Sequence, residues 1–111
     1  MSNETTADVW QRVASLSALP EGEAMSARLG DAPVAVVRAD GQVYVIDDVC
    51  THEYALLSSG FVYGCIIECP LHQATFDIRN GRCLGPPADR DLRTYLVRIE
   101  GDDILAARRA K

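Results

Sequence analysis

Apolar and polar residues alternate over short stretches along most of this chain, and such a pattern predicts β-strands. Many of the apolar residues are β-branched, which also favours strands. No window keeps a helical period, so residues 55–59 are expected to form one turn of helix at most. The expected strands cover residues 9–16, 24–29, 34–38, 43–46, 94–100 and 104–107, with very short ones at 61–62, 66–67 and 75–78.

Turn residues separate these runs where hairpins are expected. Asp40-Gly41 lies between two apolar runs, and this dipeptide suits a type I′ turn, in which both residues have a positive φ. Gly101-Asp102-Asp103 divides the last two runs, and Asn80-Gly81 marks a third turn. The chain is therefore expected to consist largely of antiparallel hairpins.

Residues 49–87 interrupt this pattern, because they are denser in Gly, Pro and Cys and their apolar runs are shorter. We predict one all-β domain of 111 residues with two parts. The base, an antiparallel barrel or sandwich, is built from residues 1–48 and 88–111. A small ligand-bearing subdomain, residues 49–87, is inserted in the base and is held at both ends.

Composition and charge narrow the class of protein. The net charge of −5 leaves no basic face for binding nucleic acid. The acidic surface suits docking to a basic patch on another protein, or it serves solubility alone. No apolar run reaches the ~18 residues of a membrane helix, and residues 1–10 lack the features of a secretory signal. We therefore expect a cytoplasmic monomer whose cysteines are metal ligands or buried thiols.

One stretch contains both histidines of the protein: Cys50-Thr51-His52, then sixteen residues, then Cys69-Pro70-Leu71-His72. Thiolates and imidazoles suit zinc, copper or iron–sulfur clusters. Structural zinc commonly takes its two cysteines from one pair and its two histidines from another, whereas here each pair is mixed. A cofactor with two different irons suits mixed pairs, with Cys50 and Cys69 on one iron and His52 and His72 on the other.

This motif resembles the ligand motif of the Rieske [2Fe–2S] family, and the resemblance extends over about residues 43–100. It continues through Leu57-Ser58-Ser59-Gly60, Phe76-Asp77, Asn80-Gly81 and Gly85-Pro86-Pro87. The resemblance implies the Rieske fold of three antiparallel sheets, with one [2Fe–2S] cluster at the tip of the inserted subdomain. It also implies that His52 and His72 lie near the surface as the electron exit, and that the proline loop covers the cluster.

The short chain is similar to the Rieske-type ferredoxins of bacterial ring-hydroxylating dioxygenase systems. That resemblance implies a one-electron carrier, not an enzyme, which takes electrons from an NAD(P)H-dependent flavin reductase and passes them to a terminal oxygenase. Two alternatives stay open. One is a small Rieske subunit of an assimilatory nitrite reductase, and the other is a zinc-stabilised interaction module with no redox role.

The residues around the ligands indicate a low-potential member of the family. High-potential members carry an extra cysteine in each ligand loop, but Ala55 and Leu71 stand at these positions, so that disulfide cannot form. They also place Ser and Tyr hydroxyls near the cluster sulfurs, where this chain has Ala74 and Phe76. Lost hydrogen bonds to sulfur lower the potential toward the bottom of the Rieske range of about −150 to +300 mV.

Some residues depart from the family pattern or lie outside it. Glu53 follows the first histidine and Gln73-Ala74 follow the second, at positions where the family often has glycine. These departures affect the expected shape of the docking surface, not cluster binding. Cys65 and Cys83 match no ligand position, and we expect both to be small buried residues.

Overall fold

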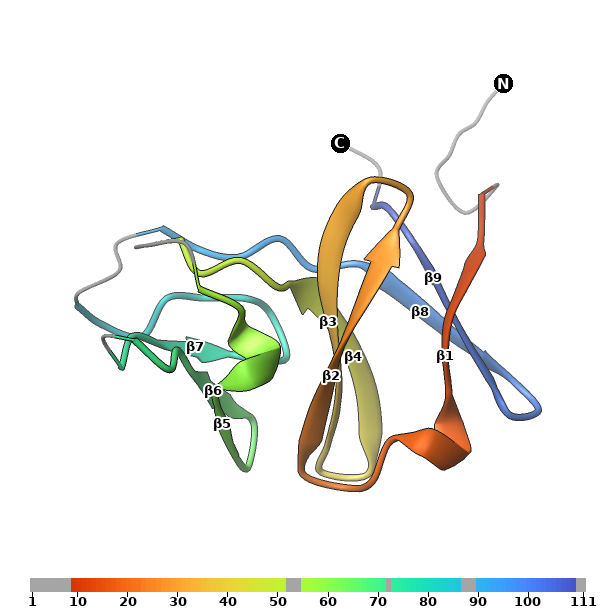
Figure 1. The fold of residues 1–111 in the computed structure, drawn as a ribbon, viewed down its shortest axis with the longest axis horizontal. Helices are drawn as coiled ribbons and strands as arrows, with labels where there is room; N and C mark the ends of the chain where they lie inside the picture. Colours follow the sequence, from red (N-terminus) through yellow and green to blue (C-terminus); the bar gives the residue numbers. More distant parts are fainter. Residues whose placement is uncertain (1–8, 52–54, 72, 87–89, 110–111) are drawn as a thin grey trace.

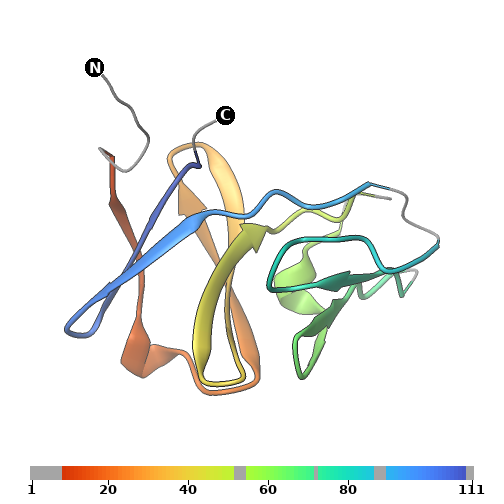
Figure 2. The ribbon, with the colours of Figure 1, turned by 180° about the vertical axis from the view of Figure 1, so that it is seen from behind.

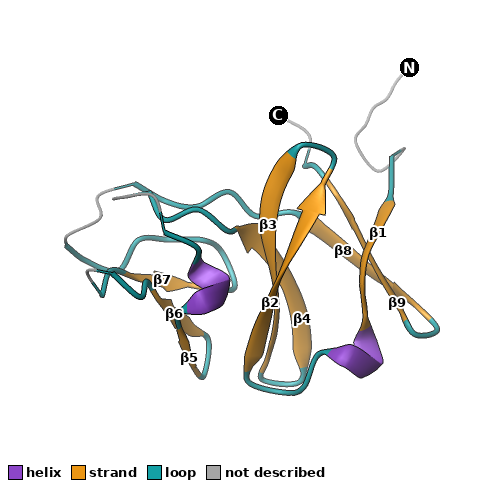
Figure 3. Ribbon diagram, in the orientation of Figure 1, coloured by secondary structure: helices purple, strands orange, loops and turns teal. Residues whose placement is uncertain are grey.

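The computed structural model describes residues 9–51, 55–71, 73–86 and 90–109. Within these ranges, nine strands form three antiparallel sheets of three strands each (Figure 1). Two short 3₁₀ turns, Leu16–Ala18 and Leu57–Ser59, are the helical segments of the described chain (Figure 3). The predicted all-β fold and its three antiparallel sheets are therefore confirmed.

The strands lie close to the predicted ranges. Those of the base are β1 (Gln11–Ser15), β2 (Glu23–Leu29), β3 (Ala32–Ala39), β4 (Gln42–Asp47), β8 (Leu96–Glu100) and β9 (Asp103–Ala107). The short strands are β5 (Phe61–Tyr63), β6 (Ile66–Glu68) and β7 (Thr75–Asp77). The first strand is shorter than predicted, because Leu16 begins the 3₁₀ turn instead of ending the strand.

The middle sheet, in the order β2-β3-β4, lies between the other two (Figure 2). On one side is the sheet β1-β9-β8, which joins strands from both ends of the chain, and on the other is β5-β6-β7. The Asp40-Gly41 turn has φ values of 55° and 76°, so the predicted β3–β4 hairpin is confirmed. The exact division of the chain at residues 48 and 88 stays a prediction.

The outgoing and returning chains run side by side between the base and the ligand-bearing part. Ile46 pairs with Thr94 in an isolated antiparallel bridge. The N–H of Tyr95 donates to the carbonyl of Val45 at 2.9 Å, and the N–H of Asp47 donates to the carbonyl of Arg93 at 3.0 Å. These bonds fasten the two connections of the ligand-bearing part to each other, which fits the prediction that it is held at both ends.

Strand β3 is buried on both of its faces. Val34 and Val36 belong to a base core, which lies between β3 and the sheet β1-β9-β8, whereas Ala35 and Val37 belong to a ligand-side core. The base core contains Ala14, Leu19, Leu29, Val34, Val36, Val45, Tyr95, Ile104 and Ala106. The ligand-side core contains Ala35, Val37, Ala39, Ile46, Cys50, Ala55, Leu57, Ile67, Cys69, Ala74, Phe76, Ile78 and Leu92.

Within the described part of the chain, no helix is both long enough and apolar enough to cross a bilayer.

Candidate metal centre

The first predicted ligand loop begins directly after β4 and the buried Asp48. Val49 and Leu56 pair as an isolated antiparallel bridge, so the residues between them form a closed loop. Inside this bridge, the N–H of Cys50 donates to the carbonyl of Ala55 at 2.9 Å. Cys50 is buried, with 3% of its surface exposed, and it belongs to the ligand-side core.

The second predicted ligand loop has the same construction. Glu68 and Thr75 pair across β6 and β7, and the N–H of Cys69 donates to the carbonyl of Ala74 at 2.8 Å. Cys69 is 1% exposed and belongs to the same core as the first cysteine. Each loop thus opens with a buried cysteine whose N–H bonds the carbonyl five residues further on, and each loop is closed by a strand pair.

Gln73 shows why the family often has glycine near this place. Its φ is 62°, in the left-handed region that a non-glycine residue enters at a cost of ~1 kcal/mol. The N–H of Gln73 donates to the carbonyl of Cys69 at 3.2 Å, which tightens the loop behind the cysteine. The glycine position is therefore a conformational requirement, which this chain meets with glutamine.

The two predicted histidine ligands, His52 and His72, lie outside the described residues, and so does Glu53. Among the residues that the structure does describe, no group of three or more His, Cys, Asp or Glu side chains gathers as a metal site. The complete ligand set therefore stays a prediction, while its two cysteines are placed in one core. Two buried thiols, each at the start of a matched loop, fit the thiolate half of a [2Fe–2S] site.

Other contacts hold the first loop against the returning chain. The hydroxyl of Thr51 donates to the carbonyl of Arg90 at 2.7 Å. The N–H of Leu84 donates to the carbonyl of Thr75 at 2.9 Å, so the segment leading to the proline loop lies beside β7. Pro87 is outside the described residues, so the covering role expected for this loop stays a prediction.

The non-ligand cysteines lie at the edge of the ligand-side core. Cys65 and Cys83 are half-buried and pack against it, so they are less buried than predicted. The carbonyl of Cys65 accepts from the N–H of Ile78 at 2.8 Å, and the thiol of Cys83 donates to the carbonyl of Gly85 at 3.4 Å. Packing and hydrogen bonding thus account for both cysteines without a role as ligands.

The surroundings of three titratable side chains, Asp77, Tyr44 and Tyr95, shift their pKa values. Arg79 forms an ion pair with Asp77 at 3.0 Å, and its side-chain hydrogen bond lowers the pKa of Asp77. Burial raises the pKa of Tyr44, which packs against the ligand-side core. Burial and a 2.6 Å hydrogen bond to Asp47 raise the pKa of Tyr95 to about 12.

The apolar residues around the loops divide into buried and exposed ones. Leu57 is fully buried, whereas Leu71 is 54% exposed and Leu84 is 49% exposed. Ala74 and Phe76 are both fully buried. The chain therefore has no side-chain hydroxyl at the two positions where high-potential family members have one, and it presents exposed leucines on two loops of the ligand-bearing part.

Comparisons with known proteins agree with this geometry. The model of the Rieske [2Fe-2S] domain matches residues 9–96. The ferredoxin component of the naphthalene 1,2-dioxygenase/salicylate 5-hydroxylase systems from a Ralstonia species is 40% identical over 96 residues, which cover 86% of this chain and 92% of that protein. The biphenyl dioxygenase ferredoxin subunit of Pseudomonas sp. strain KKS102 is 36% identical and covers 85% of this chain and 87% of its own length.

Solved structures show the same similarity. The ferredoxin of carbazole 1,9a-dioxygenase from Nocardioides aromaticivorans IC177 superposes with a TM-score of 0.87 at 35% identity, over 92% of this chain and all of that one. A protein described as a putative NADH-dependent nitrite reductase small subunit, from Mycobacterium tuberculosis, superposes with a TM-score of 0.80 at 26% identity, over 93% of this chain and 97% of that one. The chain belongs to the Rieske [2Fe-2S] family and carries one Rieske-type cluster.

Proposed function

We propose that Cys50 and Cys69 bind one iron of the cluster and that His52 and His72 bind the other. The two matched loops support this assignment, because each supplies a buried cysteine and has a histidine two or three residues further on. When bound, the cluster stores and releases a single electron. Burial of both thiols keeps water from the cysteine side of the site.

We further propose that the protein is the ferredoxin component of an aromatic ring-hydroxylating dioxygenase system, acting as a cytoplasmic monomer. It would carry single electrons from an NAD(P)H-dependent flavin reductase to the terminal oxygenase. One observation carries this proposal: ferredoxin components of such systems match the chain over almost their whole length at 36–40% identity.

The exposed leucines suit the docking that such a carrier needs. Leu71 lies in the second ligand loop, and Leu84 lies beside Cys83 near the end of the ligand-bearing part. Redox partners meet through small, short-lived interfaces with an apolar centre. These two exposed leucines provide apolar contact surface on the ligand-bearing part.

A low reduction potential is part of the proposal. Ala74 and Phe76 are buried in the ligand-side core and offer no hydroxyl to a cluster sulfur. Hydrogen bonds to sulfur stabilise the added electron, so we expect a potential near the bottom of the range of about −150 to +300 mV. A redox titration with a midpoint well above zero would contradict this expectation.

A nitrite reductase small subunit is the second candidate, since one such protein shares the fold at a TM-score of 0.80 and 26% identity. An electron-transfer assay separates the two candidates. We expect the purified protein to restore activity with the reductase and oxygenase of a naphthalene dioxygenase system, and not with a sirohaem nitrite reductase. The reverse result would select the nitrite reductase role.

Iron and sulfide analysis with EPR of the reduced protein tests the ligand set. We expect about two irons and two sulfides per chain and a Rieske-type EPR signal in the wild-type protein. His72→Ser is expected to lose both the EPR signal and the visible absorption. The matched control Cys65→Ser, outside the ligand set, is expected to keep both. A colourless, iron-free wild-type protein would overturn the proposal.

A further inference from the structure

Asp48 is the one buried charged side chain in the described part of the chain, with 0% of its surface exposed. One of its carboxylate oxygens accepts from the N–H of Ser58 at 2.7 Å, and the other accepts from the hydroxyl of Ser58 at 2.8 Å. Among the described residues, no cationic side chain forms an ion pair with it. Two donors, one to each oxygen, match the acceptor pattern of an ionised carboxylate.

The backbone of Asp48 adds to the same contact. Its carbonyl accepts from the N–H of Leu57 at 2.7 Å, and its own N–H donates to the carbonyl of Pro33 at 3.1 Å. Asp48 thus joins β3 to the 3₁₀ turn that follows the first ligand loop. Because Cys50 is two residues away, its Cα lies within about 7 Å of the Cα of Asp48.

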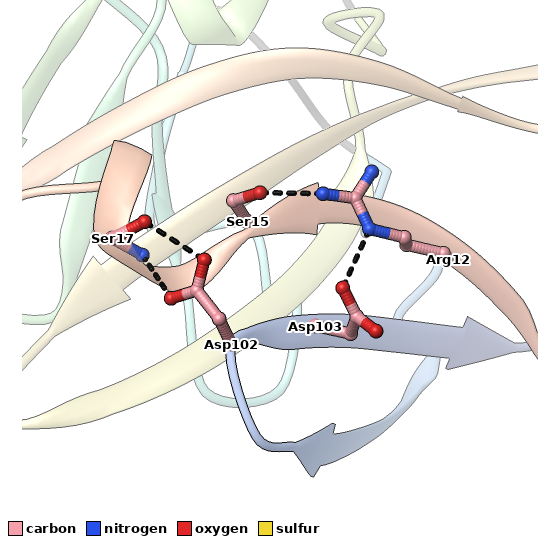
Figure 4. A network of polar contacts seen from close by, with 5 residues as sticks. All are labelled: Arg12, Ser15, Ser17, Asp102 and Asp103. Atoms are coloured by element: carbon pink, nitrogen blue, oxygen red, sulfur yellow. Dashed lines mark hydrogen bonds and ion pairs between the residues drawn. The ribbon is translucent and has the colours of Figure 1, made fainter.

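The base contains a second copy of this arrangement. The carbonyl of Asp102 accepts from the N–H of Leu16 at 2.7 Å, and its carboxylate accepts from the N–H and the hydroxyl of Ser17, both at 2.8 Å (Figure 4). In both copies a Leu-Ser pair begins a 3₁₀ turn and an aspartate from elsewhere in the chain caps it. The bonding is the same, but Asp102 is exposed and lies at the hairpin of the base.

We propose that Asp48 is a positioning residue for the first ligand loop and that its buried carboxylate lowers the reduction potential of the cluster. The inference rests on the ligand set proposed above, in which Cys50 binds iron. A negative charge that water does not screen disfavours an added electron nearby, so it makes the cluster harder to reduce. The exposed Asp102 shows that capping a turn does not by itself require a buried carboxylate.

The test compares midpoint potentials of proteins purified with their clusters. Asp48→Asn removes the charge, keeps the shape and can still exchange hydrogen bonds with Ser58, so we expect the midpoint to shift upward. Ser58→Ala keeps the charge and removes one donor, so we expect the midpoint to shift downward. Asp102→Asn and Ser17→Ala, the matched controls, are expected to leave the midpoint unchanged.

A second readout tests the positioning role. Cluster release into a chelator is expected to be faster for Ser58→Ala than for Ser17→Ala, because only the first substitution loosens a ligand loop. Opposite shifts from Asp48→Asn and Ser58→Ala support the inference, since a loss of structure alone gives no such sign change. An unchanged midpoint in Asp48→Asn, or an equal shift in Asp102→Asn, overturns it.

If Asp48→Asn does not retain the cluster, the Ser58→Ala protein decides: a downward shift supports the inference and an unchanged midpoint overturns it. A wild-type protein without iron and sulfide contradicts the proposed ligand set. A wild-type protein with its cluster, but with a midpoint that Asp48→Asn leaves in place, contradicts this inference alone.

Discussion

The two faces of β3 support two different regions of the molecule. Its base-core face packs in a core that the longer strands enclose, among them β1, β8 and β9 with five residues each. Its ligand-side face packs against strands of three residues and two loops. Only the ligand-side core includes Cys50 and Cys69, the two cysteines proposed as ligands. One strand therefore links a region held by regular sheet bonding to a region with little regular structure.

This difference shows what each region needs for its order. The base has paired strands and an apolar core, which together are the usual sources of sheet stability. The ligand-bearing part closes its two loops with single strand pairs, and its core includes the thiols of Cys50 and Cys69, which we propose as cluster ligands. Because metal binding and folding are coupled, its order is expected to depend on the cluster far more than that of the base.

Removal of the cluster is the largest perturbation of this comparison. We expect the apoprotein to lose amide exchange protection in residues 61–84, because local opening there no longer breaks iron–ligand bonds. Amides of β3, β8 and β9 are expected to keep most of their protection. Hydrogen exchange by mass spectrometry on apoprotein and holoprotein measures both regions at once.

Two results of this exchange measurement would contradict the expected difference between the base and the ligand-bearing part. Equal loss of protection in both regions would mean that the cluster stabilises the molecule as one unit. No loss in either region would mean that the ligand-side core is stable without the metal.

Val36 and Val37 provide the next test, since they are neighbours of one residue type, both fully buried, on opposite faces of β3. Val36→Ala and Val37→Ala each remove two methyl groups, so each is expected to lower the free energy of unfolding by about 2 kcal/mol. Only Val37→Ala is expected to speed cluster release. Urea unfolding and chelator kinetics measure the two effects, and equal release rates would contradict the division into two cores.

Much of the base could be predicted from the sequence, but the burial of β3 on both faces was not, although the sequence contains a signal for it. Turn residues such as Asp40-Gly41 located the hairpins, because their positive φ is a local requirement. The continuous apolar run around Val36 and Val37 is typical of a strand that is buried on both faces. We used this run to predict a strand, but not its burial on both faces. The 3₁₀ turn at Leu16–Ala18 was missed because its cap, Asp102, lies 85 residues away from Ser17.

Spacing and residue type carry ligand chemistry directly, so the sequence supplies a ligand set as a hypothesis, of which the structure places Cys50 and Cys69 in one core. The buried contact between Asp48 and Ser58 could not be predicted, because an aspartate near a loop is usually solvated and nothing local shows that this one is enclosed. The left-handed backbone at Gln73 had only an indirect signal, the glycine that the family often has there, because glutamine itself argues against a positive φ. Both features follow from tertiary packing around the loops, not from local propensity.

Tyr95 in the base core and Tyr44 beside the ligand-side core extend the comparison of the two regions to alkaline pH. Tyr95 in the base core has a pKa raised from 10.0 to about 12, so its stabilising contribution is complete below pH 10 and is lost as the pH rises toward 12. Tyr95→Phe is expected to cost about 1.5 kcal/mol near neutral pH, because the hydrogen bond to Asp47 is lost, and to flatten the decline in stability between pH 10 and 12.

Tyr44→Phe is the matched control for this measurement, since Tyr44 packs on the ligand-side core and its pKa is also raised by burial. We expect it to flatten the alkaline decline less than Tyr95→Phe does, because the hydrogen bond from the Tyr95 hydroxyl to a carboxylate adds to the effect of burial. Urea unfolding at intervals from pH 8 to pH 12 gives both profiles. A steeper decline in Tyr95→Phe than in wild type would contradict the sign.

Ion pairs on the surface of the base are expected to contribute least to the free energy of unfolding. Arg12 pairs with Asp103 at 2.7 Å, and the two side chains are 53% and 52% exposed (Figure 4). Exposed ion pairs contribute little, so Arg12→Ala is expected to lower the free energy of unfolding by about 0.5 kcal/mol, and by less in high salt. Urea unfolding of both proteins at low and high salt measures this. A loss as large as that of Val36→Ala would show that the base depends on its surface charges as much as on its core.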